Sequence, residues 1–403
     1  MEIYVSLFGE KKDVSDWLRL LEQEKVPFKY RGKSLKYFSS INVLVGFPRK
    51  KVKKFLKNGK DKIYLVESVF TPPSREKLIK AYNLLNIPYI HFWYYPTPHP
   101  TIFLFRIDVD YIYLKGLENL FKISKKFGIK GTYFLNISGE EEFDEKIGHL
   151  KLKKPTTPEP ERKKIMSKIL EKGNEIANHG YWHYVFDNIK DNYKNIRKCR
   201  YYLKKLFGIK DEGFASPGWD WNKELIKAIN KSNFLYSSHT VSDKGEFPFY
   251  EYYNNKKMNF LEIPFYEISD VKFESVLKSN QIYSNIPKIV ERLKSNYLKY
   301  IDKQIKYNKP IAIIVHPHLV GKIAKFVLPP LFKKLSYLKI PNCTLKEFAE
   351  WWRQREKFKL KYYKQNGKII IHSNSPAFIE IIFQKNKRII KLSNKNSIIL
   401  NKS

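Results

Sequence analysis

Two carboxylates stand at the end of an apolar stretch, in the segment RIDVD at residues 106–110. Side chains alternate across a strand, so Arg106, Asp108 and Asp110 are expected on one face of it. Charged groups on such a face are costly to bury unless they are paired or bound to a metal ion. The pattern therefore indicates either a catalytic carboxylate pair or a salt bridge at an exposed strand end.

Two histidines follow in the segment HGYWH, at His179 and His183. On a helix or a helical turn, two rings at this spacing share a face and can hold one metal ion. Both are neutral near pH 7, as metal binding requires. A pair at this spacing also occurs by chance, and the glycine inside it favours a turn over a regular helix.

Asp110, His179 and His183 together form the ligand set that a catalytic metal site needs. Three protein ligands leave one position open for water, and bound water with a lowered pKa can attack an amide carbonyl. Asp108 is expected beside the metal as the general base. We expect one divalent cation, with zinc as the first choice, although cobalt, nickel, manganese and iron suit the same oxygen and imidazole ligands.

Two further segments lie in loops that follow expected strands. In VHPH, His316 is the first candidate to protonate a leaving amine and His318 the second. In ASPGW, Pro217 and the glycine after it fix a tight loop, and Trp219 offers a flat apolar face that can stack on a sugar ring. We assign Pro217, Trp219 and His318 to substrate binding; the alternatives are structural histidines and a core tryptophan.

For these segments to form one site, the fold must bring the ends of their strands close together. Between residues 99 and 355, apolar strands alternate with helical stretches, which predicts an α/β fold with a (β/α) barrel, complete or incomplete. Such barrels carry their catalytic groups at the carboxyl ends of the strands. The strands expected here include Thr101–Val109, Gly131–Leu135, Gly213–Ala215, Leu235–Ser237, Phe260–Ile263 and Ile311–Val315.

Two smaller regions flank the barrel. Residues 1–98 alternate strand and helix at a shorter pitch and indicate a small parallel α/β domain, which ends in a Pro-rich linker at residues 94–100. Residues 356–403 contain short strands separated by turns and predict a small all-β module. We expect this module to dock on the barrel or on a ligand.

The chain has 403 residues and a formal net charge of +36, which points to acidic partners such as anionic lipid, phosphorylated ligands or nucleic acid. The basic residues are spread along the chain, so lysine-rich codon usage explains the excess equally well. No nucleic-acid-binding motif accompanies the charge, and nucleic acid is therefore not expected as a partner. We find no signal peptide and no apolar run long enough for a transmembrane helix, and expect a cytoplasmic protein, free or bound to the inner membrane face.

Taken in order, the motifs RIDVD, HGYWH, ASPGW and VHPH resemble those of the polysaccharide deacetylase family. The resemblance covers about residues 103–320. It implies that Asp108 is the catalytic base and His316 the catalytic acid. It also implies that Asp110, His179 and His183 bind the metal. In motif form, the chain is most similar to the deformylases of lipid-linked 4-formamido-arabinose.

The chain departs from the family pattern at two points. Ala215 stands where many members carry an arginine that orients the catalytic aspartate. Arg106 is a candidate to replace it, because it shares a strand face with Asp108 and its charge would keep that carboxylate ionised. The two aspartates are separated by one residue instead of being adjacent, which leaves the base and ligand roles of Asp108 and Asp110 exchangeable.

These features predict a metal-dependent hydrolase that removes an N-acyl group, acetyl or formyl, from an amino sugar that is free, part of a glycan or lipid-linked. Peripheral contact with anionic lipid would bring such an enzyme to a lipid-linked substrate. Two other hypotheses stay open: a non-sugar amidase of the same family, and a non-catalytic protein that binds glycans or nucleic acid. The last predicts no bound metal and no loss of function in His183→Ala.

Overall fold

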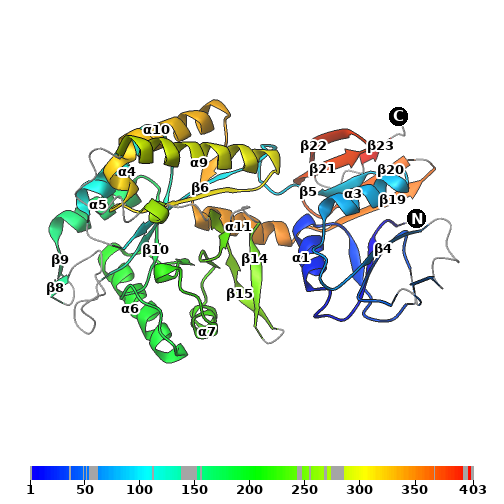
Figure 1. Cartoon of the computed structure of the whole chain (residues 1–403), viewed down its shortest axis with the longest axis horizontal. Helices are drawn as coiled ribbons and strands as arrows, with labels where there is room; N and C mark the ends of the chain where they lie inside the picture. Colours follow the sequence, from blue (N-terminus) through cyan, green and yellow to red (C-terminus); the bar gives the residue numbers. More distant parts are fainter. Residues whose placement is uncertain are drawn as a thin grey trace. The chain divides into compact units, whose positions relative to one another are not determined.

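The computed structural model (Figure 1) describes residues 2–35, 38–48, 50, 52–53, 62–110, 113–137, 152–154, 157–242, 247–253, 256–266, 270–273, 286–366, 368–393 and 398–400. Contacts divide the chain into two compact units. Unit 1 comprises Met1–Pro98 together with Trp351–Ser403, and unit 2 comprises His99–Glu350. In the described part of the chain, no helix combines the length and the apolar character needed to cross a bilayer.

Unit 1 contains a parallel sheet with the strand order β2-β1-β3-β4. Its strands are β1 (Val5–Phe8), β2 (Phe28–Tyr30), β3 (Ile41–Val45) and β4 (Ile63–Glu67). Strands β1 and β3 are buried along their whole length, which is why they are mostly apolar and show no alternation with polar residues. The same unit contains helices α1 (Ser15–Glu24) and α3 (Arg75–Leu84).

The C-terminal strands complete unit 1. Strand β21 (Ala377–Phe383) pairs antiparallel with β22 (Asn386–Leu392) and also with β5 (Tyr89–Phe92). Three further strands form a second sheet, namely β19 (Leu360–Gln365), β20 (Lys368–Ser373) and β23 (Ile398–Leu400). Tyr82 and Tyr362 are buried in one core that both parts share. Instead of forming a separate module, the C-terminal segment belongs to the same unit as the N-terminal one, because β5 supplies a partner that strand periodicity alone does not reveal.

A buried ionic cluster joins the two parts of unit 1. Arg75 donates from Nε to Glu24 at 2.9 Å and from Nη2 to Glu380. His91 lies between these carboxylates, with Nε2 2.8 Å from Glu380, and the Tyr89 hydroxyl donates to Glu24 at 2.6 Å. Because Glu24, His91 and Glu380 are buried, each charged form depends on its partners for stability.

Unit 2 is built on a sheet with the pairing order β14-β15-β12-β11-β10-β7-β6-β17, and β18 (Asn342–Cys343) also pairs with β6. All neighbours in this order are parallel except β14 and β15. The strands are β6 (Phe103–Val109), β7 (Thr132–Leu135), β10 (Glu175–Asn178), β11 (Gly213–Phe214), β12 (Tyr236–Ser237), β14 (Phe249–Tyr253), β15 (Lys256–Glu262) and β17 (Ile311–Val315). The α/β class is confirmed. A closed barrel is not, because no strand pair in the described residues joins β14 to β17.

Short elements complete the connections of unit 2. They are β8 (Leu152–Lys154), β9 (Thr157–Pro158), β13 (Val241–Ser242), β16 (Phe265–Tyr266) and the 3-10 helices η1 (Pro217–Trp219) and η2 (Asp270–Phe273). Strand β13 pairs with β16. The elements η1 and η2 carry residues of the candidate site.

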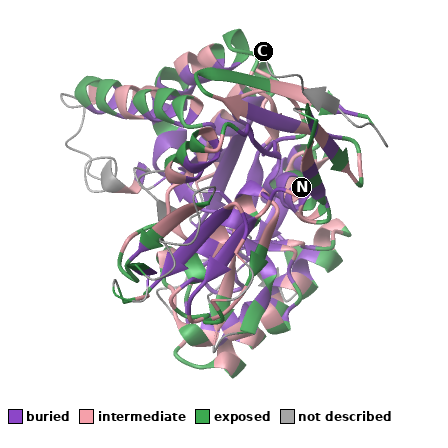
Figure 2. Ribbon diagram, turned by 90° about the vertical axis from the view of Figure 1, so that its right-hand side faces the viewer, coloured by how far each residue is buried: buried purple, intermediate pink, exposed green. Residues whose placement is uncertain are grey.

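Strands of the protein are mostly buried, whereas helices expose their outer faces (Figure 2). The described helices of unit 2 pack on its sheet and on one another. They are α4 (Leu114–Lys126), α5 (Pro160–Glu171), α6 (Ile189–Phe207), α7 (Lys223–Lys231), α9 (Ile286–Lys306), α10 (Val320–Tyr337) and α11 (Leu345–Glu356), which crosses the boundary between the units. Helix α10 packs against α4 and α9 (Figure 1). A Cβ on Gly116 in α4 would lie 2.0 Å from the carbonyl oxygen of Pro317, so only glycine permits this close approach. The contact fixes the turn that precedes α10.

Glu175 joins the amino ends of three strands at the edge of the sheet opposite to the candidate site. One carboxylate oxygen accepts hydrogen bonds from Thr132 Oγ1 at 2.8 Å and from the backbone amide of Lys346 at 3.0 Å. The other accepts from the Tyr236 hydroxyl at 2.8 Å. Burial disfavours the charged form of this carboxyl and raises the pKa of Glu175 to about 7.

Candidate active site

Three of the candidate residues directly follow strands of the unit 2 sheet. Asp110 follows β6, His179 follows β10 and His316 follows β17. These strands are linked through parallel neighbours, so their carboxyl ends lie at the same edge of the sheet. This edge is where open α/β sheets and (β/α) barrels bind their ligands.

Asp110 lies in the middle of a cluster of imidazoles. One of its carboxylate oxygens is 3.0 Å from Nε2 of His179 and 3.3 Å from Nε2 of His183. Its other oxygen is 3.5 Å from Nε2 of His316. Burial opposes ionisation of this carboxyl, but the adjacent His183 and His316 rings hold the pKa of Asp110 well below its ordinary value. The structure therefore brings the three expected metal ligands together, with His316 beside them.

His179 and His183 lie in a bend between β10 and α6, not on a helix, because α6 begins only at Ile189. Gly180 makes this bend possible: its φ is 81°, and a Cβ at this position would lie 2.7 Å from the Trp182 carbonyl oxygen. Nδ1 of His179 donates to the carbonyl oxygen of Ala215 at 2.9 Å. The ring thereby presents Nε2, as a lone-pair donor, to the position that Asp110 faces.

Arg106 holds Asp108 in a two-pronged salt bridge. Its Nε donates to one carboxylate oxygen at 2.7 Å and its Nη2 to the other at 2.6 Å. Nη1 donates to the carbonyl oxygen of Ser238, whose hydroxyl is 3.2 Å away. The guanidinium lies 4.4 Å from the ring centre of Phe265 and 5.0 Å from that of Phe134. Since both charged groups are buried, this pairing fixes the orientation of the Asp108 carboxylate.

Asp270, which the sequence analysis did not single out, orients His316. One of its oxygens is 2.7 Å from Nδ1 of His316, and the other accepts from the backbone amides of His316 at 2.8 Å and Val320 at 3.1 Å. Burial disfavours the charged imidazole, but Asp270 and Asp110 outweigh burial and raise the pKa of His316 to about 9. The ring is therefore protonated at neutral pH. A carboxylate partner for the expected acid histidine can be anticipated in general, but no local pattern distinguishes Asp270 from the other carboxylates that follow the strand expected at Phe260–Ile263.

The expected substrate-binding residues lie around this site at different depths. Pro217 and Trp219 form the turn η1 after β11; Pro217 is buried and Trp219 is half-buried. The Trp219 ring centre is 5.9 Å from that of Phe265, the ring that also covers the Arg106 salt bridge. His318 is buried, with its ring centre 5.5 Å from that of His316. Trp219 is thus the most exposed of the three expected substrate contacts.

The donor set fits a divalent metal ion. Ligand atoms of Asp110, His179 and His183 all lie within 4.8 Å of one another, near enough for one ion to contact all three. Two imidazoles and one carboxylate suit zinc and other first-row metals. Asp108, Asp110 and His316 meet the same distance criterion. Both oxygens of Asp108 are already bound by Arg106, however, which favours the first set as ligands.

A comparison of the sequence with models of protein families gives a match in the same region as the candidate site. A model of the polysaccharide deacetylase family matches residues 100–237, which contain the first three motifs. No match was found among curated proteins. A candidate polysaccharide deacetylase from Mycobacterium smegmatis is similar in structure, with 16% sequence identity, a TM-score of 0.50, and coverage of 65% of this chain and 93% of that one.

Two other solved structures are similar at lower TM-scores. A candidate polysaccharide deacetylase from Pseudomonas aeruginosa has 15% identity and a TM-score of 0.47, covering 68% of this chain and 97% of that one. An allantoinase has 16% identity and a TM-score of 0.46, covering 65% and 93%. The chain thus matches the polysaccharide deacetylase family model over residues 100–237 and is similar in fold to the Mycobacterium smegmatis structure.

Proposed function

We propose that this protein is a metal-dependent hydrolase that removes an N-acyl group from an amino sugar in a glycan. The observation that carries the proposal is the convergence of Asp110, His179 and His183 beside the Asp108 carboxylate and the His316 ring. The family match supports the substrate class. N-acetyl sugars are the first candidate substrates and N-formyl sugars the second.

Asp110, His179 and His183 are the residues that would hold the metal ion, with zinc as the first candidate. When bound, a divalent cation supplies Lewis acidity, which polarises the acyl carbonyl and makes water easier to deprotonate. Asp108, which Arg106 holds in a fixed orientation, accepts a proton from the water that attacks the carbonyl carbon.

His316 completes the reaction by donating its proton to the amide nitrogen as the carbon–nitrogen bond breaks. The sugar then leaves as a neutral amine, and the acyl group leaves as a carboxylic acid. Asp270 holds His316 from the opposite ring nitrogen and stabilises its charged form before the transfer. We propose that Trp219, Pro217 and His318 contact the sugar on the open side of this site.

We also propose where the substrate is found in the cell. The motif form and the net charge of +36 support a lipid-linked sugar that a cytoplasmic enzyme handles at the anionic inner face of a membrane. Binding to anionic but not to neutral vesicles is the measurement that tests this proposal.

The test of the proposed function combines elemental analysis with product release. Purified protein is expected to contain about one transition-metal ion per chain and to release acetate or formate from a panel of N-acyl amino sugars. His183→Ala is expected to lose both, because it removes one of three ligands. His372→Ala is the matched control, since His372 is exposed on β20 in unit 1 and its loss is expected to change neither value. A metal-free protein, or a His183→Ala variant with unchanged product release, would contradict the proposal.

A further inference from the structure

Helix α6 follows the loop of the HGYWH motif (Figure 1). One face of this helix lines a groove with basic side chains. Five residues line it, namely Lys190, Tyr193, Lys194, Arg197 and Lys198. Their spacing of three, four and seven residues places them on one face of the helix. The lining thus consists of four cationic side chains and one aromatic ring.

Three of the four cationic groups of this groove have no acidic ion-pair partner among the described residues. In the described part of the chain, no carboxylate lies within ion-pair distance of Lys190, Lys194 or Arg197, and all three are exposed. The carboxylate of the nearby Asp191 accepts a hydrogen bond from Nδ2 of Asn188 at the start of the helix. The three side chains Lys190, Lys194 and Arg197 concentrate positive potential on this face of the helix, and positive potential attracts anions.

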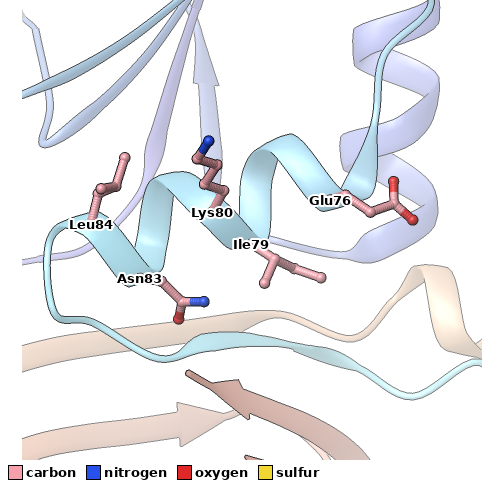
Figure 3. A pocket seen from close by; sticks show the side chains of 5 residues that line it. All are labelled: Glu76, Ile79, Lys80, Asn83 and Leu84. Atoms are coloured by element: carbon pink, nitrogen blue, oxygen red, sulfur yellow. The ribbon is translucent and has the colours of Figure 1, made fainter. Parts of the chain in front are cut away.

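The groove on α3 in unit 1 provides a contrast (Figure 3). It is lined by Glu76, Ile79, Lys80, Asn83 and Leu84, so it contains one acid, one base and two apolar side chains. This composition favours no particular ligand. The concentration of charge beside α6 is therefore a property of that groove and does not follow from a high lysine content alone.

Aromatic contacts connect the α6 groove to the loop that carries two candidate metal ligands. Nζ of Lys198 lies 3.8 Å from the ring centre of Tyr181 and 4.6 Å from that of Trp182. Both aromatic residues stand between His179 and His183 in the sequence and are buried. The groove therefore adjoins the loop that carries two of the candidate metal ligands.

We propose that the α6 groove binds the carboxylate or phosphate groups of an acidic glycan, so that the enzyme selects acidic N-acylated glycans over neutral ones. This inference rests on the proposed function. Arg197 offers a planar fork that matches carboxylate and phosphate oxygens, and the lysines add point charges. A lipid bilayer fits the groove less well, because the lining contains no aliphatic side chain to enter the acyl region.

Three hexasaccharides of equal length separate the possibilities: chitin, which is neutral; hyaluronan, which carries carboxylates; and phosphorylated chitin. Titration calorimetry is expected to show at least about tenfold tighter binding of one or both acidic probes than of the neutral one, with the preference lost at high salt. The better of the two acidic probes identifies the anionic group.

The variant Lys194→Glu/Arg197→Glu is expected to weaken acidic-probe binding by about tenfold or more and to leave neutral-probe binding unchanged. Lys325→Glu/Lys333→Glu is the matched control: it changes the net charge by the same amount at exposed positions of α10 and is expected to retain tight binding. Equal binding of all three probes by the wild type, or an equal loss in both variants, would overturn the inference. So would an α6 variant that loses binding to phosphatidylglycerol vesicles or single-stranded DNA while it retains the acidic glycan.

Product release from the neutral probe, measured in parallel, separates this inference from the proposed function. If the enzyme releases product from the neutral probe but binds all three probes equally, the groove inference is wrong and the proposed function stands. If the acidic probes bind in a way that depends on α6 but no N-acyl sugar yields product, the catalytic proposal is wrong. The α6 groove would then be a glycan-binding site.

Discussion

Arg106 is the residue on which the orientation of Asp108 depends, since its guanidinium bonds both carboxylate oxygens and the Ser238 carbonyl. We expect Arg106→Ala to lower kcat by roughly ten- to a hundredfold, the usual effect of removing a group that orients a catalytic one. Arg106→Lys is expected to recover only part of this loss, because an ammonium group restores the charge but not the fork. Steady-state kinetics at equal metal content provides the measurement. A wild-type kcat in Arg106→Ala would contradict the positioning role.

Asp270 supports the charged form of His316, which predicts a change in pH dependence. The folded-state pKa of His316 is raised to about 9 by Asp270 and Asp110. Activity that needs the protonated ring is therefore present at neutral pH and falls as pH rises through that value. In Asp270→Asn, one of the carboxylates that raise the pKa of His316 is lost. The alkaline limb of the kcat profile is therefore expected to move to lower pH. A limb that stays in place would show that His316 does not supply the proton.

The candidate metal ligands are predictable from the sequence, whereas the residues that support the candidate site are not. Asp110, His179 and His183 stand in short motifs whose residue types and spacing match a metal site. Asp270 is 46 residues from His316, and Ser238 is 132 residues from Arg106. Contacts over such separations depend on how each loop returns to the sheet, and no local pattern records that path.

At the scale of elements, Glu175 makes the strand edge sensitive to pH. Its carboxyl has a pKa of about 7 in the folded protein, against an ordinary value of 4.5. Between these values the folded state retains a proton that the unfolded state releases, so stability falls as pH rises from about 4.5 to about 7. The shift corresponds to at most on the order of 3 kcal/mol.

Glu175→Gln copies the protonated carboxyl and is expected to remove this slope. The variant should unfold at a higher temperature than the wild type at pH 8, and the difference should shrink towards pH 5. Thermal melts across that pH range measure it. A difference that does not vary with pH would rule out Glu175 as the titrating group.

The apolar pattern predicts strands best where they are buried on both sides. The strand expected at Ile311–Val315 is β17 with the same bounds, because a buried parallel strand is a continuous apolar run. Strand β15 instead begins at Lys256, four residues before its expected start, because its exposed first half is held by pairing with β14. Pairing of β5 with β21 is equally invisible in the local sequence, since the two strands come from opposite ends of the chain.

At the scale of the whole molecule, unit 1 is discontinuous in sequence. Removing residues 357–403 would take away strand β21 and Glu380, and would leave Arg75 and His91 with only one of their two buried carboxylate partners, Glu24. Breaking one buried ion pair costs about 3–5 kcal/mol, a large share of the roughly 5–15 kcal/mol that stabilises a domain.

The truncated chain is therefore expected to lose the structure of residues 1–98 and to retain protected amides in the unit 2 sheet. Hydrogen exchange monitored by mass spectrometry distinguishes the two regions. Undiminished protection of Tyr89–Phe92 in the truncated chain would contradict the shared-core arrangement.

The discontinuity of unit 1 also sets an order of events during synthesis. Roughly 280 residues separate β5 from β21, and at about 5–20 residues per second a ribosome needs on the order of tens of seconds to add them. Throughout that interval the emerged β5 segment has an unsatisfied strand edge, which is the kind of surface through which nascent chains aggregate. The sheet of unit 2 is complete in sequence once β18 has been made at Asn342–Cys343, before β21 begins at Ala377, so unit 2 can fold while unit 1 still lacks this strand.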